Sequence, residues 1–113
     1  MATWEDVVAH ASALPGAEVS TWYRTPAVKV GGKGFVRLRD EADGALVVLC
    51  GLAEKEALLA SGDPAFFTTA HYDGHGSVLV HLDRVDDAQL RELVTEAWRT
   101  RAPARVRQEL DDA

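Results

Sequence analysis

Potential metal ligands gather in one short segment of the chain, at His71, Asp73 and His75, with His81 a few residues further on. A protein metal site needs three or four such donors that converge on one point and are held there by supporting hydrogen bonds. Here Asp73-Gly74 is itself a strong turn signal, so the three positions straddle a bend. We therefore expect a loop that holds no metal and no other cofactor.

The chain also lacks a recognisable arrangement of residues for acid–base or nucleophilic catalysis. His71-Tyr72-Asp73 has no second carboxylate at a spacing that would place it opposite the first. Cys50 ends the most apolar stretch, where burial raises the pKa of a thiol and makes it a poor nucleophile. Gly31-Gly32-Lys33-Gly34 is not a phosphate-binding loop, because position 27 is alanine and no Ser or Thr follows the lysine. The sequence predicts a protein that is not an enzyme.

Positive charge is concentrated in two windows, 24–39 and 99–107, which hold nine of the twelve Lys and Arg residues. No acidic residue lies between Glu18 and Asp40 or between Glu96 and Glu109. Alternation puts two arginines of the first window on one face of a strand, and a β-hairpin carrying such residues can follow a nucleic-acid backbone. The sequence therefore predicts a DNA-binding protein with five candidate contacts: Arg24, Lys29, Lys33, Arg37 and Arg39. An alternative stays open, in which these side chains cover an exposed sheet face with their aliphatic stems.

Aromatic side chains near strand ends support a different function. Trp22, Tyr23 and Tyr72 could line a pocket for a small molecule or form an anchor patch for a protein partner. The simpler interpretation is that these rings pack at the rim of the core. Charge separates the hypotheses, because an anion site needs arginines that Asp and Glu do not neutralise.

Length and composition suit one domain over residues 1–113, with 47% hydrophobic residues, 27% charged residues and a net charge of −6. That charge argues against a protein that coats nucleic acid nonspecifically. The first residues lack the basic region and apolar run of a signal peptide, and no apolar stretch is long enough to cross a bilayer. A single cysteine cannot form an internal disulfide, which suits a reducing compartment. We expect a cytoplasmic protein, monomeric or weakly dimeric, with no membrane partner.

The periodicity of apolar residues predicts the elements that position these groups. Helical spacing covers residues 3–14, 52–61 and 86–101, and a last short helix follows Pro103. A period of two covers 19–23, 27–30, 35–39 and 45–50, the last of which is apolar on both faces and should be a central strand. Residues 66–71 and 77–82 should pair as a hairpin around 73–76. In the strand 35–39, alternation places Phe35, Arg37 and Arg39 on one face and Val36 on the other.

Short connections between these strands make the predicted sheet antiparallel. The fold class is therefore α+β, with about five to six strands packed against an N-terminal helix and C-terminal helices.

Several segments together resemble the MmcQ/YjbR-like family of small bacterial proteins. They are Thr25-Pro26-Ala27-Val28-Lys29-Val30, Gly32-Lys33-Gly34-Phe35-Val36-Arg37-Leu38, His71-Tyr72-Asp73-Gly74, Val78-Leu79-Val80, and Ala97-Trp98-Arg99 followed by Ala102-Pro103. The resemblance covers nearly the whole chain and implies an α+β sandwich, similar to the frataxin-like shape and to a double-wing DNA-binding domain of a phage transcription factor. It also implies DNA binding, as that likeness of fold suggests. The first helix carries only Glu5 and Asp6, so no frataxin-type acidic iron ridge is expected.

Overall fold

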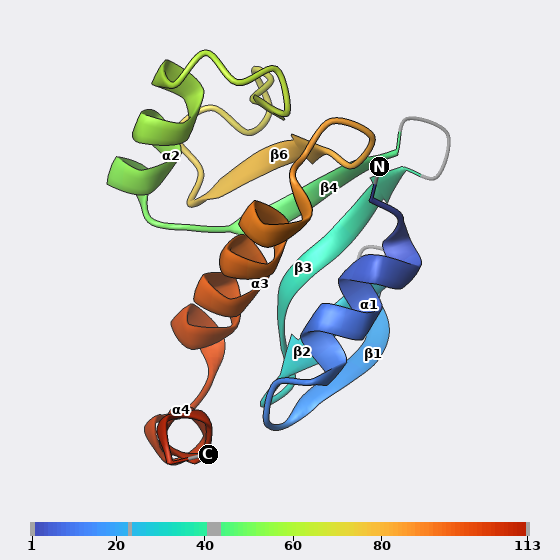
Figure 1. The fold of residues 1–113 in the computed structure, drawn as a ribbon, viewed down its shortest axis with the longest axis vertical. Coiled ribbons are helices and arrows are strands. Elements are labelled where there is room, and N and C mark those ends of the chain that lie inside the picture. The colour runs from blue at the N-terminus through green and yellow to red at the C-terminus, as the bar shows by residue number, and fades with distance from the viewer. Residues whose placement is uncertain (1, 23, 41–43, 113) are drawn as a thin grey trace.

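A computed structural model describes residues 2–22, 24–40 and 44–112 of the chain. Its strands form a six-stranded antiparallel sheet in the order β1-β2-β3-β4-β6-β5 (Figure 1). The strands are β1 (Ala17–Trp22), β2 (Thr25–Val30), β3 (Lys33–Asp40), β4 (Ala45–Leu49), β5 (Phe66–Phe67) and β6 (Ser77–His81). The helices are α1 (Trp4–Ser12), α2 (Leu52–Ala60), α3 (Asp87–Arg101) and α4 (Ala104–Asp111). The predicted α+β class and antiparallel sheet are confirmed.

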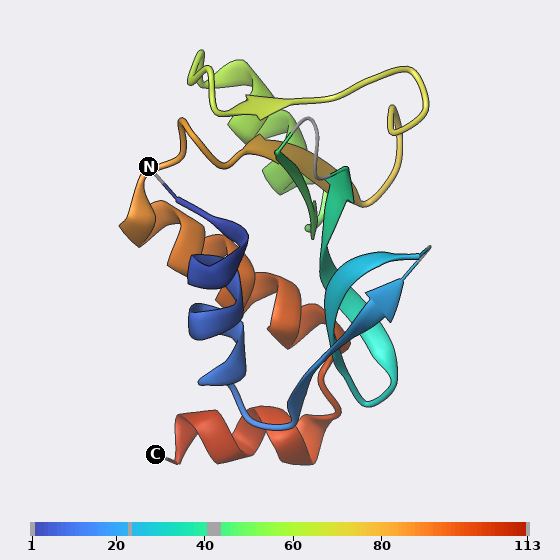
Figure 2. The ribbon, with the colours of Figure 1, turned by 90° about the vertical axis from the view of Figure 1, so that its right-hand side faces the viewer.

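One face of the sheet, here called the inner face, is covered by α1 and α3, which lie side by side across it (Figures 1 and 2). The apolar stripe of α3 is buried as its spacing predicts, at Leu90, Leu93, Val94, Ala97 and Trp98. These side chains meet the inward residues of the central strands, such as Val36, Leu46 and Val78, which are fully buried. Apolar residues that repeat every two positions in the strands and about every 3.6 positions in the helix therefore face each other and form one core.

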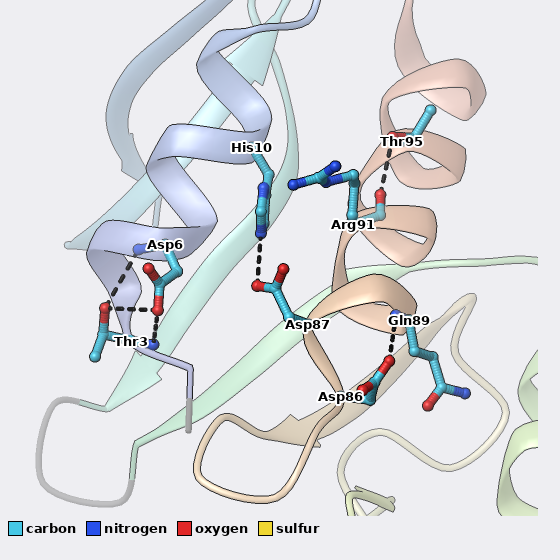
Figure 3. Close-up of polar contacts among 8 residues, drawn as sticks. All are labelled: Thr3, Asp6, His10, Asp86, Asp87, Gln89, Arg91 and Thr95. Carbon is cyan, nitrogen blue, oxygen red and sulfur yellow. Dashed lines mark hydrogen bonds and ion pairs between the residues drawn. The ribbon is translucent and has the colours of Figure 1, made fainter.

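The two covering helices are capped and joined by polar contacts at one end (Figure 3). Thr3 and Asp6 form the capping box that opens α1, and the Asp86 side chain accepts a hydrogen bond from the amide of Gln89 to open α3. His10 of α1 lies 3.1 Å from the Asp87 carboxylate of α3. Each helix thus has its start fixed by its own sequence.

The prediction that Phe35 shares a face with Arg37 and Arg39 is wrong. The β2–β3 register shifts between Val28 and Lys29, so that Val28 pairs with Val36 but Lys29 pairs with Gly34. Phe35 is the extra residue of this bulge and lies fully buried in the core. A bulge turns two successive side chains out of strict alternation, which a period of two cannot represent.

The predicted hairpin over 66–71 and 77–82 is also corrected. β5 holds only Phe66 and Phe67, and residues 68–76 form a long loop before β6. The predicted bend exists inside this loop, where the His75 amide donates to the Tyr72 carbonyl at 3.0 Å and Gly74 has φ +79°. In Figure 2 the loop lies on the side of the sheet opposite α1 and α3. It therefore partly covers the second face, here called the outer face.

The strand 45–50 predicted to be central is confirmed, because β4 lies between β3 and β6 and is buried along most of its length. At the far end of the sheet, the Trp98 indole donates to the Pro15 carbonyl at 2.8 Å and fixes the end of α3 against the turn after α1. Among the described residues, no helix is both long and apolar enough to cross a bilayer.

Candidate functional site

The outer face carries a hollow of about 620 Å³ beneath the loop 68–76, here called the outer hollow. Its floor comes from alternate residues of two neighbouring strands, Val47 and Leu49 of β4 and Ser77 of β6. Leu49 and Ser77 are cross-strand partners, and Val47 pairs with Arg37 of β3 on its other side. Because alternate residues of a strand share one face, this floor follows directly from the pairing register.

Trp22 forms one wall of the outer hollow because a glycine makes room for it. A Cβ atom built on Gly34 would lie only 2.5 Å from the Trp22 ring, closer than real Cβ contacts allow. The ring therefore lies directly on the β3 backbone at Gly34. A larger residue at position 34 would force the indole away from the hollow.

Arg37 stands beside this indole and joins the strand to the loop. Its guanidinium carbon lies 5.9 Å from the centre of the Trp22 ring, within the range of a cation–π contact. Its Nη2 atom donates to the Tyr72 hydroxyl at 2.5 Å, and its Nη1 atom donates to the Thr25 hydroxyl at 3.4 Å. Arg37 and Tyr72 are thus tied across the outer hollow, which both of them line.

The loop side of the outer hollow consists of three neighbouring rings and a buried anchor. The rings of His71 and His75 are stacked with centres 5.8 Å apart, and Tyr72 meets each of them edge-on, with centres 4.8 and 6.1 Å away. Lys55 of α2, only 5% exposed, donates from its ammonium to the carbonyls of Tyr72 at 2.5 Å and His75 at 2.9 Å. A buried ammonium with two carbonyl acceptors fixes the backbone that carries these rings.

Arg101 closes the outer hollow from the end of α3. Its Nε atom is buried and has no hydrogen-bond partner within the described part of the chain. Arg37 and Arg101 come from the two separate basic windows of the sequence, so the fold brings the two windows together at this point. The described residues that line the outer hollow include these two arginines and two histidines but no aspartate or glutamate.

The other candidates for DNA contact do not line the outer hollow. Lys29 of β2 lies opposite Glu18 of β1 in the strand register, and Arg39 lies over the Phe67 ring at 5.6 Å. Arg24 and Lys33 are exposed, Arg24 with φ +63° in the turn before β2. Arg37 is half-buried at the outer hollow, as described above.

Of the three residues predicted to line a ligand pocket, Trp22 and Tyr72 do line the outer hollow. Tyr23 lies outside the described residues. Sequence reasoning missed Arg101, His71 and His75 as lining residues and Lys55 as the anchor. The arginine-rich window 99–107 was the available signal for Arg101, but cations at a helix end are also favoured by the helix dipole.

Two other groups that could take part in chemistry are held by contacts elsewhere in the structure. Burial is the main cause that raises the pKa of the Cys50 thiol to about 11, with a smaller contribution from Glu54. His81 stacks on Phe67 with ring centres 4.2 Å apart. Among the described residues, no three His, Cys, Asp or Glu side chains gather as a metal site would require.

Comparison with known proteins identifies relatives along almost the entire chain. The YjbR family model matches residues 12–100. The chain is 32% identical to the uncharacterised protein Rv2570 of Mycobacterium tuberculosis and, to the same extent, to the uncharacterised protein Mb2600 of Mycobacterium bovis. Each alignment covers 94% of this chain and 93% of the relative.

A solved structure has the same fold. The crystal structure of Deinococcus radiodurans protein DR2400, described by the family-model domain DUF419, superposes with a TM-score of 0.74 over 87% of this chain and 77% of that one, at 21% identity. The match to the family model confirms the resemblance seen in the sequence motifs, and this chain belongs to the YjbR family.

Proposed function

We propose that this protein is a binding module for a small molecule that occupies the outer hollow. The supporting observation is that Trp22 and Tyr72, on elements far apart in the sequence, line one cavity of about 620 Å³ with an apolar floor. Ligand pockets in proteins usually measure about 300–1,000 Å³ and combine apolar walls with a few polar groups. The outer hollow has both the size and the composition of such a pocket.

A binding role suits the lining better than catalysis. No hydrogen bond within the described chain joins the side chain of His71 or His75 to Ser77 or to a carboxylate. A nucleophilic hydroxyl needs such a base, and the base needs a third group to orient it. The polar groups of the outer hollow are therefore suited to hold a ligand rather than to transform it.

The test is a thermal-shift screen of the whole chain against a metabolite and fragment library. A ligand present at 100 times its dissociation constant adds about 2.7 kcal/mol to the free energy of unfolding. We expect binders that shift the backbone NMR resonances of residues 47–49 and 71–77. Trp22→Ala should weaken binding about tenfold or more, whereas Trp4→Ala, on α1, should leave it unchanged. A screen without binders, or binders that perturb only other residues, would reject the proposal.

DNA binding through the β2–β3 hairpin is the second hypothesis, and exposed Arg24 and Lys33 are the observation that favours it. The half-buried Arg37 and Arg39, which contact Tyr72 and Phe67, support it less. Affinity for a duplex should fall with salt at a log–log slope of about −0.9 for each neutralised phosphate. Arg24→Gln and Lys33→Gln should each reduce that slope by about one. Absence of binding at low salt would reject this hypothesis. A protein partner that uses the same aromatic rings stays a prediction.

A further inference from the structure

Arg101 lines the outer hollow, and the Nε atom of its guanidinium group has no hydrogen-bond partner within the described chain. This atom is buried. A buried donor without a partner is costly, and more so when it belongs to a charged group. The guanidinium is a planar fork of N–H donors whose geometry matches the oxygens of a carboxylate or a phosphate. A guanidinium group in the wall of the outer hollow therefore indicates what kind of ligand group would bind there.

The charges around Arg101 favour the same kind of group. The chain as a whole has a net charge of −6 with histidine neutral, yet the described lining of the outer hollow holds Arg37 and Arg101 and no acidic residue. A concave site lined by one sign of charge raises the local concentration of ligands of the opposite sign. The outer hollow is therefore a positively charged site on a negatively charged protein, and it favours an anionic ligand.

The other walls indicate what the anion is attached to. The Trp22 indole is held flat against Gly34, and the Tyr72 ring is held by Arg37 and by the Lys55 anchor of its loop. Val47 and Leu49 supply an apolar floor between them. Fixed aromatic walls above an apolar floor suit a flat, apolar ring, which stacks on aromatic side chains at little cost in conformational entropy.

We infer that the ligand of the outer hollow is a planar aromatic oxyanion. Its carboxylate or phosphate group binds the guanidinium of Arg101, and its ring lies against Trp22 and Tyr72. This inference rests on the proposed small-molecule role of the outer hollow, and it adds the chemical class of the ligand.

The test uses four probes with one ring and different charges: 2-naphthoate, 2-naphthyl phosphate, 2-naphthamide and 2-naphthylmethylamine. Each is titrated into the ¹⁵N-labelled chain of residues 1–113, and dissociation constants are read from the resonances of residues 71–77. We expect at least one oxyanion to bind at least tenfold more tightly than the amide, and the amine to bind most weakly. The ratio of the carboxylate to the phosphate tells which oxyanion the site prefers.

Variants assign the preference to Arg101. Arg101→Gln should reduce the ratio of oxyanion to amide affinity to about one, whereas Arg105→Gln, an exposed arginine on α4, should preserve it. Arg101→Lys keeps the charge but loses the planar fork, so it should retain part of the preference and serves as the informative variant if Arg101→Gln does not fold. Equal binding of the amide, or a preference that survives both Arg101 variants, would overturn the inference while leaving a small-molecule site in place.

A different result would reject the small-molecule role of the outer hollow itself. If the library screen and all four probes leave residues 47–49 and 71–77 unperturbed, the outer hollow is not a ligand site, and the inference is overturned with it. If neutral library compounds bind there but neither oxyanion does, only the assignment of the ligand class is overturned.

Discussion

The two faces of the sheet are built from the same alternating strands, but they differ in what covers them. On the inner face, Val36, Leu46 and Val78 are fully buried under α1 and α3. On the outer face, the alternate residues of β3, β4 and β6 include Arg37 and Ser77 and are covered in part by the loop 68–76. One face is closed and apolar, and the other is half-open, aromatic and positive. We therefore propose that the inner face provides stability and that the outer face binds the ligand.

The sharpest test of this division is Trp98→Ala on the inner face. Trp98 is fully buried, and its indole donates to the Pro15 carbonyl. Removal of a large buried aromatic side chain should lower the free energy of unfolding by about 3–5 kcal/mol, measured by urea denaturation. Trp22→Ala, which removes a half-buried indole from the outer face, should cost clearly less. Equal losses for the two variants would contradict the division.

Gly34→Ala tests whether the backbone of β3 holds the Trp22 ring in place. The added Cβ would lie 2.5 Å from the ring, so the indole must move. We expect a loss of about 1–3 kcal/mol in stability together with a change in the fluorescence of Trp22. Gly51→Ala is the control, because a Cβ there meets no atom within 4 Å. An unchanged Trp22 signal in Gly34→Ala would show that the ring does not depend on this glycine.

Lys55→Met tests the anchor of the loop while roughly keeping the volume of the side chain. The carbonyls of Tyr72 and His75 lose their ammonium donor, which should cost about 1–3 kcal/mol, concentrated in the loop. Amide hydrogen exchange at His75 should become about tenfold faster, while the buried amides of β4 change less. Lys33→Met, at an exposed position, should leave the loop unchanged. A loop that keeps its protection without Lys55 would argue against the anchor.

The smallest effect is expected from Asp87→Asn, which weakens the polar link between α1 and α3. The Asp87 carboxylate lies 3.1 Å from His10, but its side chain is 66% exposed. Exposed ion pairs contribute about 0.2–1 kcal/mol, so the loss in urea denaturation should stay within that range. A loss above about 2 kcal/mol would mean that charge, rather than apolar packing, holds the inner layer together.

The sequence was sufficient to predict the elements whose residues follow a regular period. The stripe of α3, the capping residues Thr3 and Asp86, and the doubly apolar β4 all express a local rule that one window of sequence contains. The family resemblance added the arrangement of these elements; the match to the YjbR model confirms the family, and the solved structure of a similar protein has the same fold.

The outer hollow could be predicted only in part, because it depends on distant segments. Trp22 and Tyr72 stood out as aromatic residues near strand ends, but nothing local shows that Arg37 and Arg101 line the same hollow. That arrangement follows from the path of α3 across the sheet. The bulge that buries Phe35 and the burial of Lys55 in α2 likewise arise from packing between elements. Local patterns predict faces, and tertiary contacts decide which side chains share a site.

The most direct test of the account compares the indole N–H resonances of Trp22 and Trp98 in one ¹⁵N spectrum, as the strongest binder from the screen is titrated in. Trp22 lines the outer hollow and Trp98 is fully buried beneath the inner face. The account predicts that the Trp22 resonance moves along a saturable curve while that of Trp98 stays in place. A Trp98 resonance that moves as far as that of Trp22, or a Trp22 resonance that does not move at saturation, would contradict it.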